Sequence, residues 1–379
     1  MKNLSLLVVS ACLSATMSCK KEIRANEKIV NTALKGCNAN SSLNELSDSG
    51  TRFGALVKST NLSPDEKIKV CNALGVKYAR NSVILKDFNG KDVAVEKYLA
   101  NGFKVLLNLN FGRVQTPKGR RPVAYPTDMV EYRTLVEKVL DKYTPHIALI
   151  ENEETNSLFH TGKIEDYITE LKTAVDICKR RSIMVADGGL NTVMVCILVY
   201  RDFVARGMQK TADEFGRLAL NSNNLKTAKG FGSADENAKL LTTEKLINAI
   251  KTIDLDYVNI HFHAPWLDYD PNSVPPKILK QIGDYLRSAT GKEVICGEFS
   301  EHNKSVDLIT SMVNEIKAGG YAYGIVFSGN SVSGAEPLNE GIRLFGKWCC
   351  FCTCYTINDK QIPEDLWKKE MIKSKSKYA

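Results

Sequence analysis

The sequence lacks the glycine-rich phosphate-binding patterns GxGxxG and GxxxxGK[ST] after any of its apolar runs, so nothing supports a doubly wound nucleotide-binding sheet. It also lacks two separated cysteine pairs, the usual arrangement of zinc ligands. Five cysteines stand singly among apolar residues and four crowd into one segment: Cys37, Cys71, Cys178, Cys196 and Cys296, then Cys349, Cys350, Cys352 and Cys354. We therefore expect no metal and no other cofactor.

Long basic runs are scarce as well. The net charge is +8 over 379 residues, and only the C-terminus is rich in lysine, so the charge does not imply a nucleic-acid partner. The composition, 44% hydrophobic and 25% charged, is that of a globular protein with a large core.

Residues 1–19 resemble a bacterial lipoprotein signal peptide. Lys2 precedes an apolar stretch that is too short to remain as a transmembrane helix and that ends at Ser18-Cys19-Lys20. The resemblance implies that Cys19 becomes the acylated first residue, with 20–45 as a polar tether, in an exported protein held in the cell envelope by its lipid. Plain secretion with an incidental cysteine is the alternative.

Short apolar runs alternate with stretches of helical period over 46–345. Eight runs predict strands, at 52–57, 77–84, 103–110, 146–152, 183–187, 256–263, 293–299 and 323–328. Helices are expected after Ser63-Pro64 and over 93–101, 127–143, 164–180, 275–289 and 303–318. This alternation predicts an α/β fold, a single (β/α)₈ barrel.

Two segments depart from the repeating pattern. Residues 191–255 are long for one connection and predict two or three helices, an insertion between strands five and six at the periphery or mouth of the barrel. Residues 346–379 form a cysteine-rich and then basic tail to which no role can be given.

Polar residues gather at the predicted strand ends, where barrel enzymes build their active sites. They are Arg80-Asn81-Ser82, Asn108 and Asn110, Glu151 to Glu154, Asp187, His261 and His263, Glu298, and Ser328-Gly329-Asn330. Of these, Asn108, Asn110 and His263 are expected to bind the substrate. Glu153 and Glu298 follow strands four and seven, on opposite sides of the barrel mouth. Such a pair can supply the acid and the nucleophile that cleave a glycosidic bond.

These residues resemble clan A of the glycoside hydrolases, retaining enzymes with an Asn-Glu pair after strand four and a nucleophilic Glu after strand seven. Asn152-Glu153 and Glu298 match these motifs, and Arg80 and His261 match an arginine and a histidine of the clan. The resemblance implies a carbohydrate substrate, Glu153 as acid/base, Glu298 as nucleophile, Asn152 as a ligand of a sugar hydroxyl, and Arg80 and His261 as residues that orient the carboxylates.

The chain also departs from the clan. His263 stands where the clan often has Tyr, and Phe327-Ser328 where it often has Trp. A surface barrel that binds glycans without turnover is therefore an alternative. A metal-dependent isomerase, lyase or hydrolase is another, because His261 and His263 project to the same side of a strand and could bind a metal with Glu153 or Glu298.

Two loops could contribute to substrate binding. Trp266 follows strand six, where its ring could stack on a sugar or merely anchor the loop. Arg113, Lys118, Arg120 and Arg121 make the loop after strand three basic, which favours an anionic glycan if that loop reaches the substrate.

Overall fold

Eight parallel strands form a closed ring in the computed structural model, which describes residues 50–57, 62–116, 119–264, 278–301 and 306–327. The sheet order is β10-β11-β12-β13-β1-β2-β3-β7-β9, and a further pairing of Tyr257 on β11 with Ala186 on β9 closes it. The ring strands are β1 (Arg52–Leu56), β2 (Tyr78–Ile84), β3 (Lys104–Asn110), β7 (Ile147–Ile150), β9 (Met184–Asp187), β11 (Tyr257–Ala264), β12 (Glu293–Glu301) and β13 (Tyr323–Phe327). The predicted (β/α)₈ barrel is confirmed.

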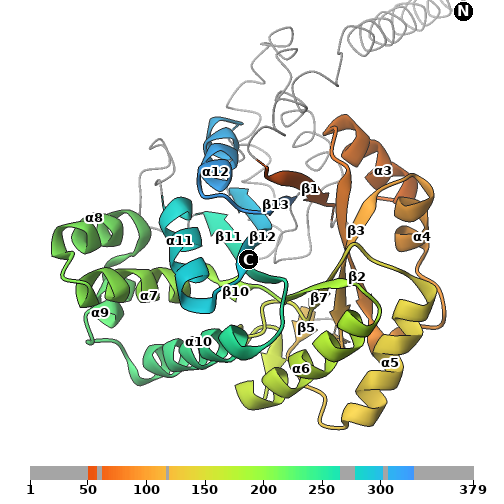
Figure 1. Cartoon of the computed structure of the whole chain (residues 1–379), viewed down its shortest axis with the longest axis horizontal. Coiled ribbons are helices and arrows are strands. Elements are labelled where there is room, and N and C mark those ends of the chain that lie inside the picture. The colour runs from red at the N-terminus through yellow and green to blue at the C-terminus, as the bar shows by residue number, and fades with distance from the viewer. Residues whose placement is uncertain (1–49, 58–61, 117–118, 265–277, 302–305, 328–379) are drawn as a thin grey trace, which may run out of the picture. The chain divides into compact units, whose positions relative to one another are not determined.

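Helices surround the ring (Figure 1). They are α3 (Pro64–Ala73), α4 (Val93–Ala100), α5 (Met129–Lys142), α6 (Ile164–Arg180), α7 (Thr192–Ala205), α8 (Gln209–Ala219), α9 (Ser222–Ala228), α10 (Ala234–Thr252), α11 (Leu279–Thr290) and α12 (Val306–Ala318). Local sequence explains their ends. Ser63 forms a capping box with Glu66 ahead of α3, and Gly291 ends α11 in a left-handed conformation.

Several short elements were not predicted. A turn of 3₁₀ helix, η2 (Leu85–Asp87), follows β2, and β4 (Val114–Thr116) and β5 (Gly119–Arg121) form a hairpin after β3. β6 (Val123–Ala124) pairs with β8 (His160–Thr161), and β10 (Leu190–Asn191) adds to β11. These pieces are too short for a hydrophobic period to reveal them.

The segment 191–255 holds four helices, α7 to α10, rather than the two or three expected. The short α9 is the extra element, since its seven residues, Ser222–Ala228, carry little apolar periodicity. In Figure 1 these helices lie outside the ring of strands. The insertion is therefore peripheral.

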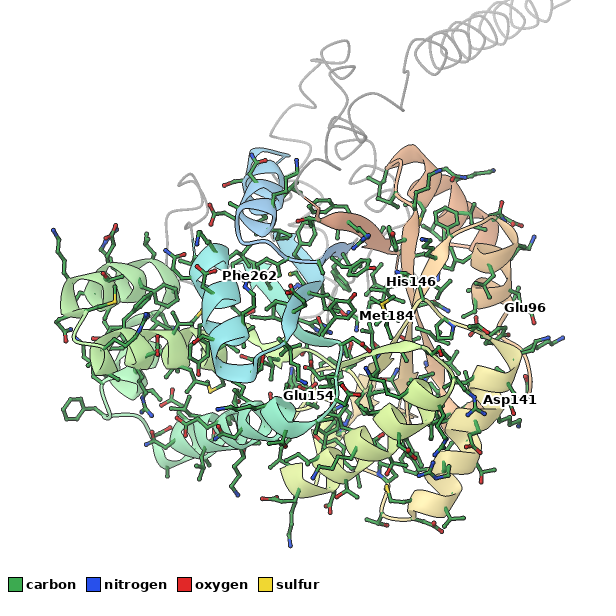
Figure 2. All side chains as sticks on the ribbon, in the orientation of Figure 1. Glu96, Asp141, His146, Glu154, Met184 and Phe262 are labelled. Atoms are coloured by element: carbon green, nitrogen blue, oxygen red, sulfur yellow. The ribbon has the colours of Figure 1, made fainter. Side chains whose placement is uncertain are left out.

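The inner face of the barrel changes from apolar to polar along its axis. Leu106, Leu149 and Ile295 belong to a buried interior cluster, and Figure 2 shows His146 and Met184 at the ring of strands, with Glu96 and Asp141 among the outer helices. Polar side chains occupy the inner face toward the C-terminal ends of the strands, where the site lies. Among the described residues, no helix combines the length and the apolar character needed to cross a membrane.

Candidate active site

A strained turn after β7 presents Glu153. The strand ends at Ile150, two residues earlier than the predicted strand 146–152, because the backbone turns sharply: φ is 64° at Glu151 and 50° at Glu153. Left-handed conformations are uncommon outside glycine and cost about 1–3 kcal/mol each, so the surroundings must impose them.

Hydrogen bonds from neighbouring elements hold this turn. Tyr167 Oη donates to the carbonyl of Ile150 (3.0 Å), and Asn108 Nδ2 donates to that of Glu151 (2.6 Å). His160 Nε2 lies 2.9 Å from the carbonyl oxygen of Asn152, and Tyr125 donates to the carbonyl of Glu154. Each carbonyl from Ile150 to Glu154 except that of Glu153 thus has a side-chain partner, which keeps Glu153 aimed at the site.

A β-bulge presents the second carboxylate. The β11–β12 register shifts between Ile260, paired with Cys296, and His261, paired with Glu298, which leaves Gly297 as the extra residue. The Gly297 N–H donates to Asn259 Oδ1 (2.8 Å), and a Cβ at Gly297 would lie 2.3 Å from that oxygen. Only glycine fits there, so the bulge that aims Glu298 depends on it.

Arg80 connects the parts of the site. Its guanidinium is 1% exposed and projects from the middle of β2, not from the strand end as expected. Nη1 donates to Glu298 Oε1 (2.7 Å) and to the Gly297 carbonyl (2.9 Å), and Nη2 donates to Asn152 Oδ1 (2.9 Å). Arg80 therefore fixes the nucleophile candidate and the amide beside Glu153 relative to each other.

The protonation of His261 follows from its contacts. Nε2 lies 3.1 Å from Arg80 Nη1, and arginine can only donate, so Nε2 must be the unprotonated nitrogen. The proton is then on Nδ1, which donates to Glu153 Oε1 at 3.2 Å. Burial lowers the pKa of His261 and outweighs the opposing charge of Glu298, so the ring is neutral.

His263 contacts the other oxygen of Glu298. Its Nε2 lies 3.3 Å from Glu298 Oε2, and its Nδ1 lies 2.8 Å from Ser300 Oγ. In the neutral ring, a serine hydroxyl donating to Nδ1 leaves Nε2–H to donate to the carboxylate. The histidine that departs from the clan pattern thus makes a direct contact with the nucleophile candidate.

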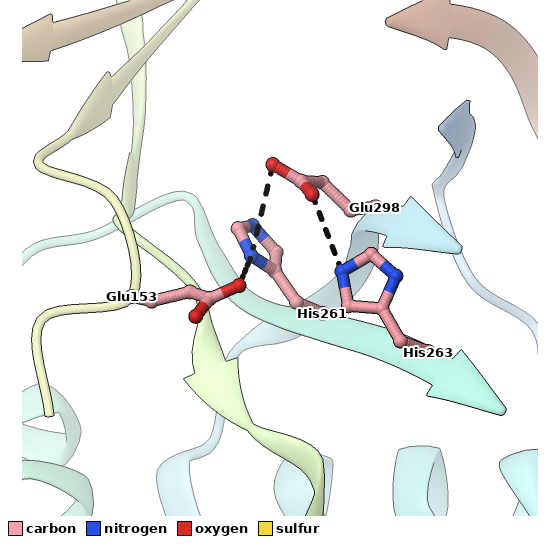
Figure 3. A group of neighbouring side chains, drawn as sticks. All are labelled: Glu153, His261, His263 and Glu298. Atoms are coloured by element: carbon pink, nitrogen blue, oxygen red, sulfur yellow. Dashed lines mark hydrogen bonds and ion pairs between the residues drawn. The ribbon is translucent and has the colours of Figure 1, made fainter. Parts of the chain in front are cut away.

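The two carboxylates face each other across His261 (Figure 3). One ligand atom from each of Glu153, His261, His263 and Glu298 lies within 4.8 Å of the others, so an oxygen of Glu153 lies within 4.8 Å of an oxygen of Glu298. Burial raises the pKa of Glu298, but its interactions with His261, with the Arg80 guanidinium and with His263 hold it well below its ordinary value. Burial also raises the pKa of Glu153, and the interactions with His261 and Asn156 more than offset it, so the net pKa is lowered.

Two histidines and two glutamates at this spacing are also the residue types that bind zinc. A metal would need the lone pair of His261 Nδ1, which requires the proton to move to Nε2. Nε2–H would then point at the Arg80 guanidinium, donor against donor. The hydrogen bonds of the site therefore do not fit a metal centre that includes His261.

A second acidic group lies behind the site. Glu151 and Glu154 are each 2% exposed, and Glu170 on α6 and Asp187 on β9 are fully buried. The carboxyl group of Glu154 interacts with that of Asp187, and the carboxyl group of Glu170 interacts with that of Glu151. Burial and the neighbouring carboxylate raise the pKa of Glu154 and of Glu170, so each pair favours a state in which one of its two acids is protonated.

The remaining predicted site residues divide into three groups. Asn108 and Asn110 are 0% and 3% exposed, and Asn108 accepts from Arg80 Nη2 at 2.5 Å, so its expected contact with a sugar does not fit its placement. Asp187 accepts hydrogen bonds from the backbone of Asn259 and Gly189 and interacts with Glu154. The remaining predictions fall outside the described residues: Cys19, Lys118, Trp266, Ser328 to Asn330, the segments 20–45 and 346–379, and the side chains of Arg120 and Arg121.

Two features of the site were missed from the sequence although they left traces in it. A glycine inside an apolar strand often marks a bulge, and Gly297 directly precedes Glu298. Four polar residues, Glu151 to Glu154, directly follow a fully buried strand, a place where charges need partners.

No known protein family and no curated protein matches this sequence. Among solved structures, an endo-1,4-β-mannanase from Rhizomucor miehei is similar with a TM-score of 0.47 and 11% identity, over 80% of this chain and 95% of that one. An endo-β-1,3-glucanase from Sorangium cellulosum has a TM-score of 0.46 and 11% identity, over 79% and 97%. The endo-β-1,4-mannanase domain of Bacillus sp. JAMB-750 has 0.45 and 10%, over 81% and 87%. Such distant likenesses do not identify an activity, and the barrel is established by the strand order of the chain itself.

Proposed function

We propose that this chain is a glycoside hydrolase that cleaves O-glycosidic bonds of an oligo- or polysaccharide with retention of configuration. The observation that carries the proposal is the pair Glu153 and Glu298, with oxygens within 4.8 Å of each other at the C-terminal end of the barrel. Retaining enzymes hold their carboxyl groups about 5–5.5 Å apart, whereas inverting enzymes need roughly 6.5–9.5 Å to admit a water.

The proposed reaction has two steps. A Glu298 oxygen forms a bond to the anomeric carbon while the bond to the leaving oxygen breaks, and Glu153 gives its proton to that oxygen. Glu153, now ionised, then takes a proton from water as the water oxygen displaces Glu298. Arg80 keeps Glu298 ionised and aimed, which suits a nucleophile.

The lowered pKa of Glu153 suits the second step directly, because the base must be ionised. The first step needs Glu153 protonated, so it is favoured at acid pH. A bound sugar also favours it, since displacing water from a buried carboxylate raises its pKa. We therefore expect an acid pH optimum.

The test is hydrolysis of a panel of aryl glycosides and oligosaccharides by the wild type, Glu153→Gln and Glu298→Gln. Proton magnetic resonance identifies the anomer released first, and a retained anomer supports the mechanism. Each Gln variant should lower kcat by at least about 10²-fold, as loss of acid–base assistance does. The exposed Glu165→Gln serves as a control that should change nothing. An inverted product or active Gln variants would remove the mechanism.

A glycan-binding barrel without turnover is the second candidate, favoured by the same lowered pKa of Glu153, which works against proton donation. Titration calorimetry with the oligosaccharide panel distinguishes the two. A binding protein would hold its ligand without cleaving it, and Glu153→Gln would bind it equally well. An enzyme would lose turnover in this variant and keep its affinity.

We also propose that the protein is exported and anchored in the cell envelope through a lipid on Cys19, on the strength of the leader sequence alone. Metabolic labelling with a fatty acid tests this. The wild type should carry the label and sediment with membranes, whereas Cys19→Ser should do neither. An unlabelled wild type would instead favour plain secretion.

A further inference from the structure

The pair formed by Glu154 and Asp187 is connected to both candidate catalytic residues. Glu154 directly follows Glu153 on the strained turn, and its backbone carbonyl accepts from Tyr125. Asp187 Oδ1 accepts the Asn259 N–H at 2.7 Å, and Asn259 Oδ1 in turn accepts the N–H of Gly297, the bulge residue before Glu298. A movement of the pair would therefore reach the backbone at Glu153 and at Glu298.

The contacts of the two carboxyl groups are unequal. Asp187 accepts two backbone N–H groups, from Asn259 on Oδ1 and from Gly189 on Oδ2 (3.3 Å), an arrangement that suits a carboxylate. Among the described residues, no N–H group other than that of Glu154 itself and no hydroxyl donates to the carboxyl oxygens of Glu154, which is 2% exposed. A buried carboxyl without donors is stable only as the neutral acid.

From this inequality we infer that Glu154 is a protonated positioning residue, which donates its proton to Asp187 and thereby holds the turn that presents Glu153 and the bulge that presents Glu298. The role of Glu154 in positioning the two carboxylates rests on the proposed function, but the protonation of Glu154 is independent of it. Gly188 leaves room for the contact, because a Cβ there would lie 2.7 Å from Glu154 Oε2.

The groups that face the pair favour keeping its proton. Burial raises the pKa of Glu154 well above its ordinary value, and the charge of Asp187 raises it further. Burial likewise raises the pKa of Asp187, although its backbone hydrogen bonds oppose this. Four other titratable groups interact with Glu154: Glu151 and Glu153 on its own turn, Tyr125 ahead of α5, and Tyr167 on α6. The neighbouring Glu151 is contacted in turn by Glu170 on α6 and by His160. Loss of the shared proton would leave two adjacent buried charges.

The assignment predicts opposite responses to two substitutions of the same kind. Gln at position 154 carries an N–H where the acid carries its proton, so Glu154→Gln should keep kcat within about threefold of the wild type. Asn at position 187 must turn an amide NH₂ toward a backbone N–H, so Asp187→Asn should lose at least about tenfold in kcat with little change in KM, the size expected for an unsatisfied buried group. Equal retention in both variants, or loss in Glu154→Gln alone, would overturn the assignment.

Stability against pH gives a readout that needs no activity. A carboxyl group whose pKa is raised by folding stabilises the protein fully below its unfolded pKa of about 4, and this stabilisation is lost as the pH rises through the folded pKa. The thermal midpoint should therefore fall less steeply with rising pH in Glu153→Gln/Glu154→Gln than in Glu153→Gln alone. Identical slopes would refute the inference, whereas a failed hydrolysis assay with different slopes would refute only the proposed function.

If either variant does not fold, infrared spectroscopy of the wild type can still overturn the inference. A carbonyl stretch of a protonated carboxylic acid should persist at neutral pH, where ordinary carboxyl groups are ionised. Its absence would overturn the inference.

Discussion

The guanidinium of Arg80 meets the ring of His261 nitrogen to nitrogen, with Nη1 3.1 Å from Nε2. The contact is favourable only for one tautomer of the histidine, since arginine has no acceptor. One buried cation on β2 thereby decides which nitrogen of a residue on β11 can donate to Glu153.

His261 should be neutral at neutral pH and carry its proton on Nδ1. Burial lowers its pKa from the ordinary value, so protonation of the ring requires pH below the ordinary histidine range. Two-dimensional nitrogen–proton spectra of histidine-labelled protein distinguish the tautomers, and His261→Gln assigns the signals. A proton on Nε2 would contradict the reading of the contact with Arg80.

Removal of metals should leave the activity unchanged. The tautomer of His261 places a proton on the nitrogen that a metal would need, so dialysis against a chelator is expected to alter neither kcat nor KM. Activity should be measured before dialysis, after it, and after addition of Zn²⁺. A loss on dialysis that Zn²⁺ restores would instead favour the metal-dependent enzyme.

The sequence predicted the barrel because its information is local and periodic. Runs such as Val105 to Leu107 must be buried on both faces, which is characteristic of parallel strands covered by helices, and those strands lie within a residue or two of their predicted positions. The position of Glu153 and Glu298 at one end of the barrel followed from the same counting.

What the sequence could not provide is the direction of individual side chains. Glu151, Glu153 and Glu154 are alike in composition, yet the left-handed turn sends Glu153 to the site and its neighbours into the protein. Arg80 was expected at a strand end because the alternation of residues along a strand does not show how far a long side chain extends from the middle of that strand. The pair Glu154–Asp187 depends on an interaction between residues 33 positions apart, as their numbers in the sequence show.

Gly189→Ala should reduce activity by displacing His261. The φ of Gly189 is 120°, and a Cβ there would lie 2.4 Å from His261 Nε2, so the ring must move away from Arg80 or the backbone must shift. Gly207→Ala is a matched control, since its φ is 72° and nothing lies within 4 Å of its Cβ. Both variants should lose about 1 kcal/mol or more of stability through backbone strain, but only Gly189→Ala should lose turnover. Equal turnover in the two would show that His261 tolerates displacement.

Asn156→Ala should move the alkaline limb of kcat/KM to higher pH. Asn156 Nδ2 donates to Glu153 Oε2 at 2.6 Å and contributes to the lowered pKa of that acid. Because the first step needs protonated Glu153, kcat/KM falls as the pH rises through this pKa, and removing the donor raises it. Asn101→Ala, which removes only a bond to a helix carbonyl, should leave the profile in place. An unmoved limb in Asn156→Ala would mean that another group controls it.

Arg80→Met should destabilise the protein by about 3–5 kcal/mol at neutral pH, because it leaves the buried Glu298 carboxylate without its 2.7 Å partner. The defect should shrink as the pH falls toward the ordinary pKa of glutamate, near 4.3, since burial now favours the protonated acid. The wild type behaves oppositely: folding lowers the pKa of Glu298, so its contribution to stability is present above the unfolded pKa and is lost as the pH falls through the folded one.

Urea denaturation at several pH values measures these differences, and Arg80→Met/Glu298→Gln should recover much of the loss because it removes both charges. Arg133→Ala, which breaks an exposed ion pair with Asp176, should change stability by no more than about 0.5 kcal/mol. A loss that is independent of pH and is not recovered in the double variant would mean that Arg80 stabilises the barrel through its bonds to Asn108 and Asn152 and not through the charge of Glu298.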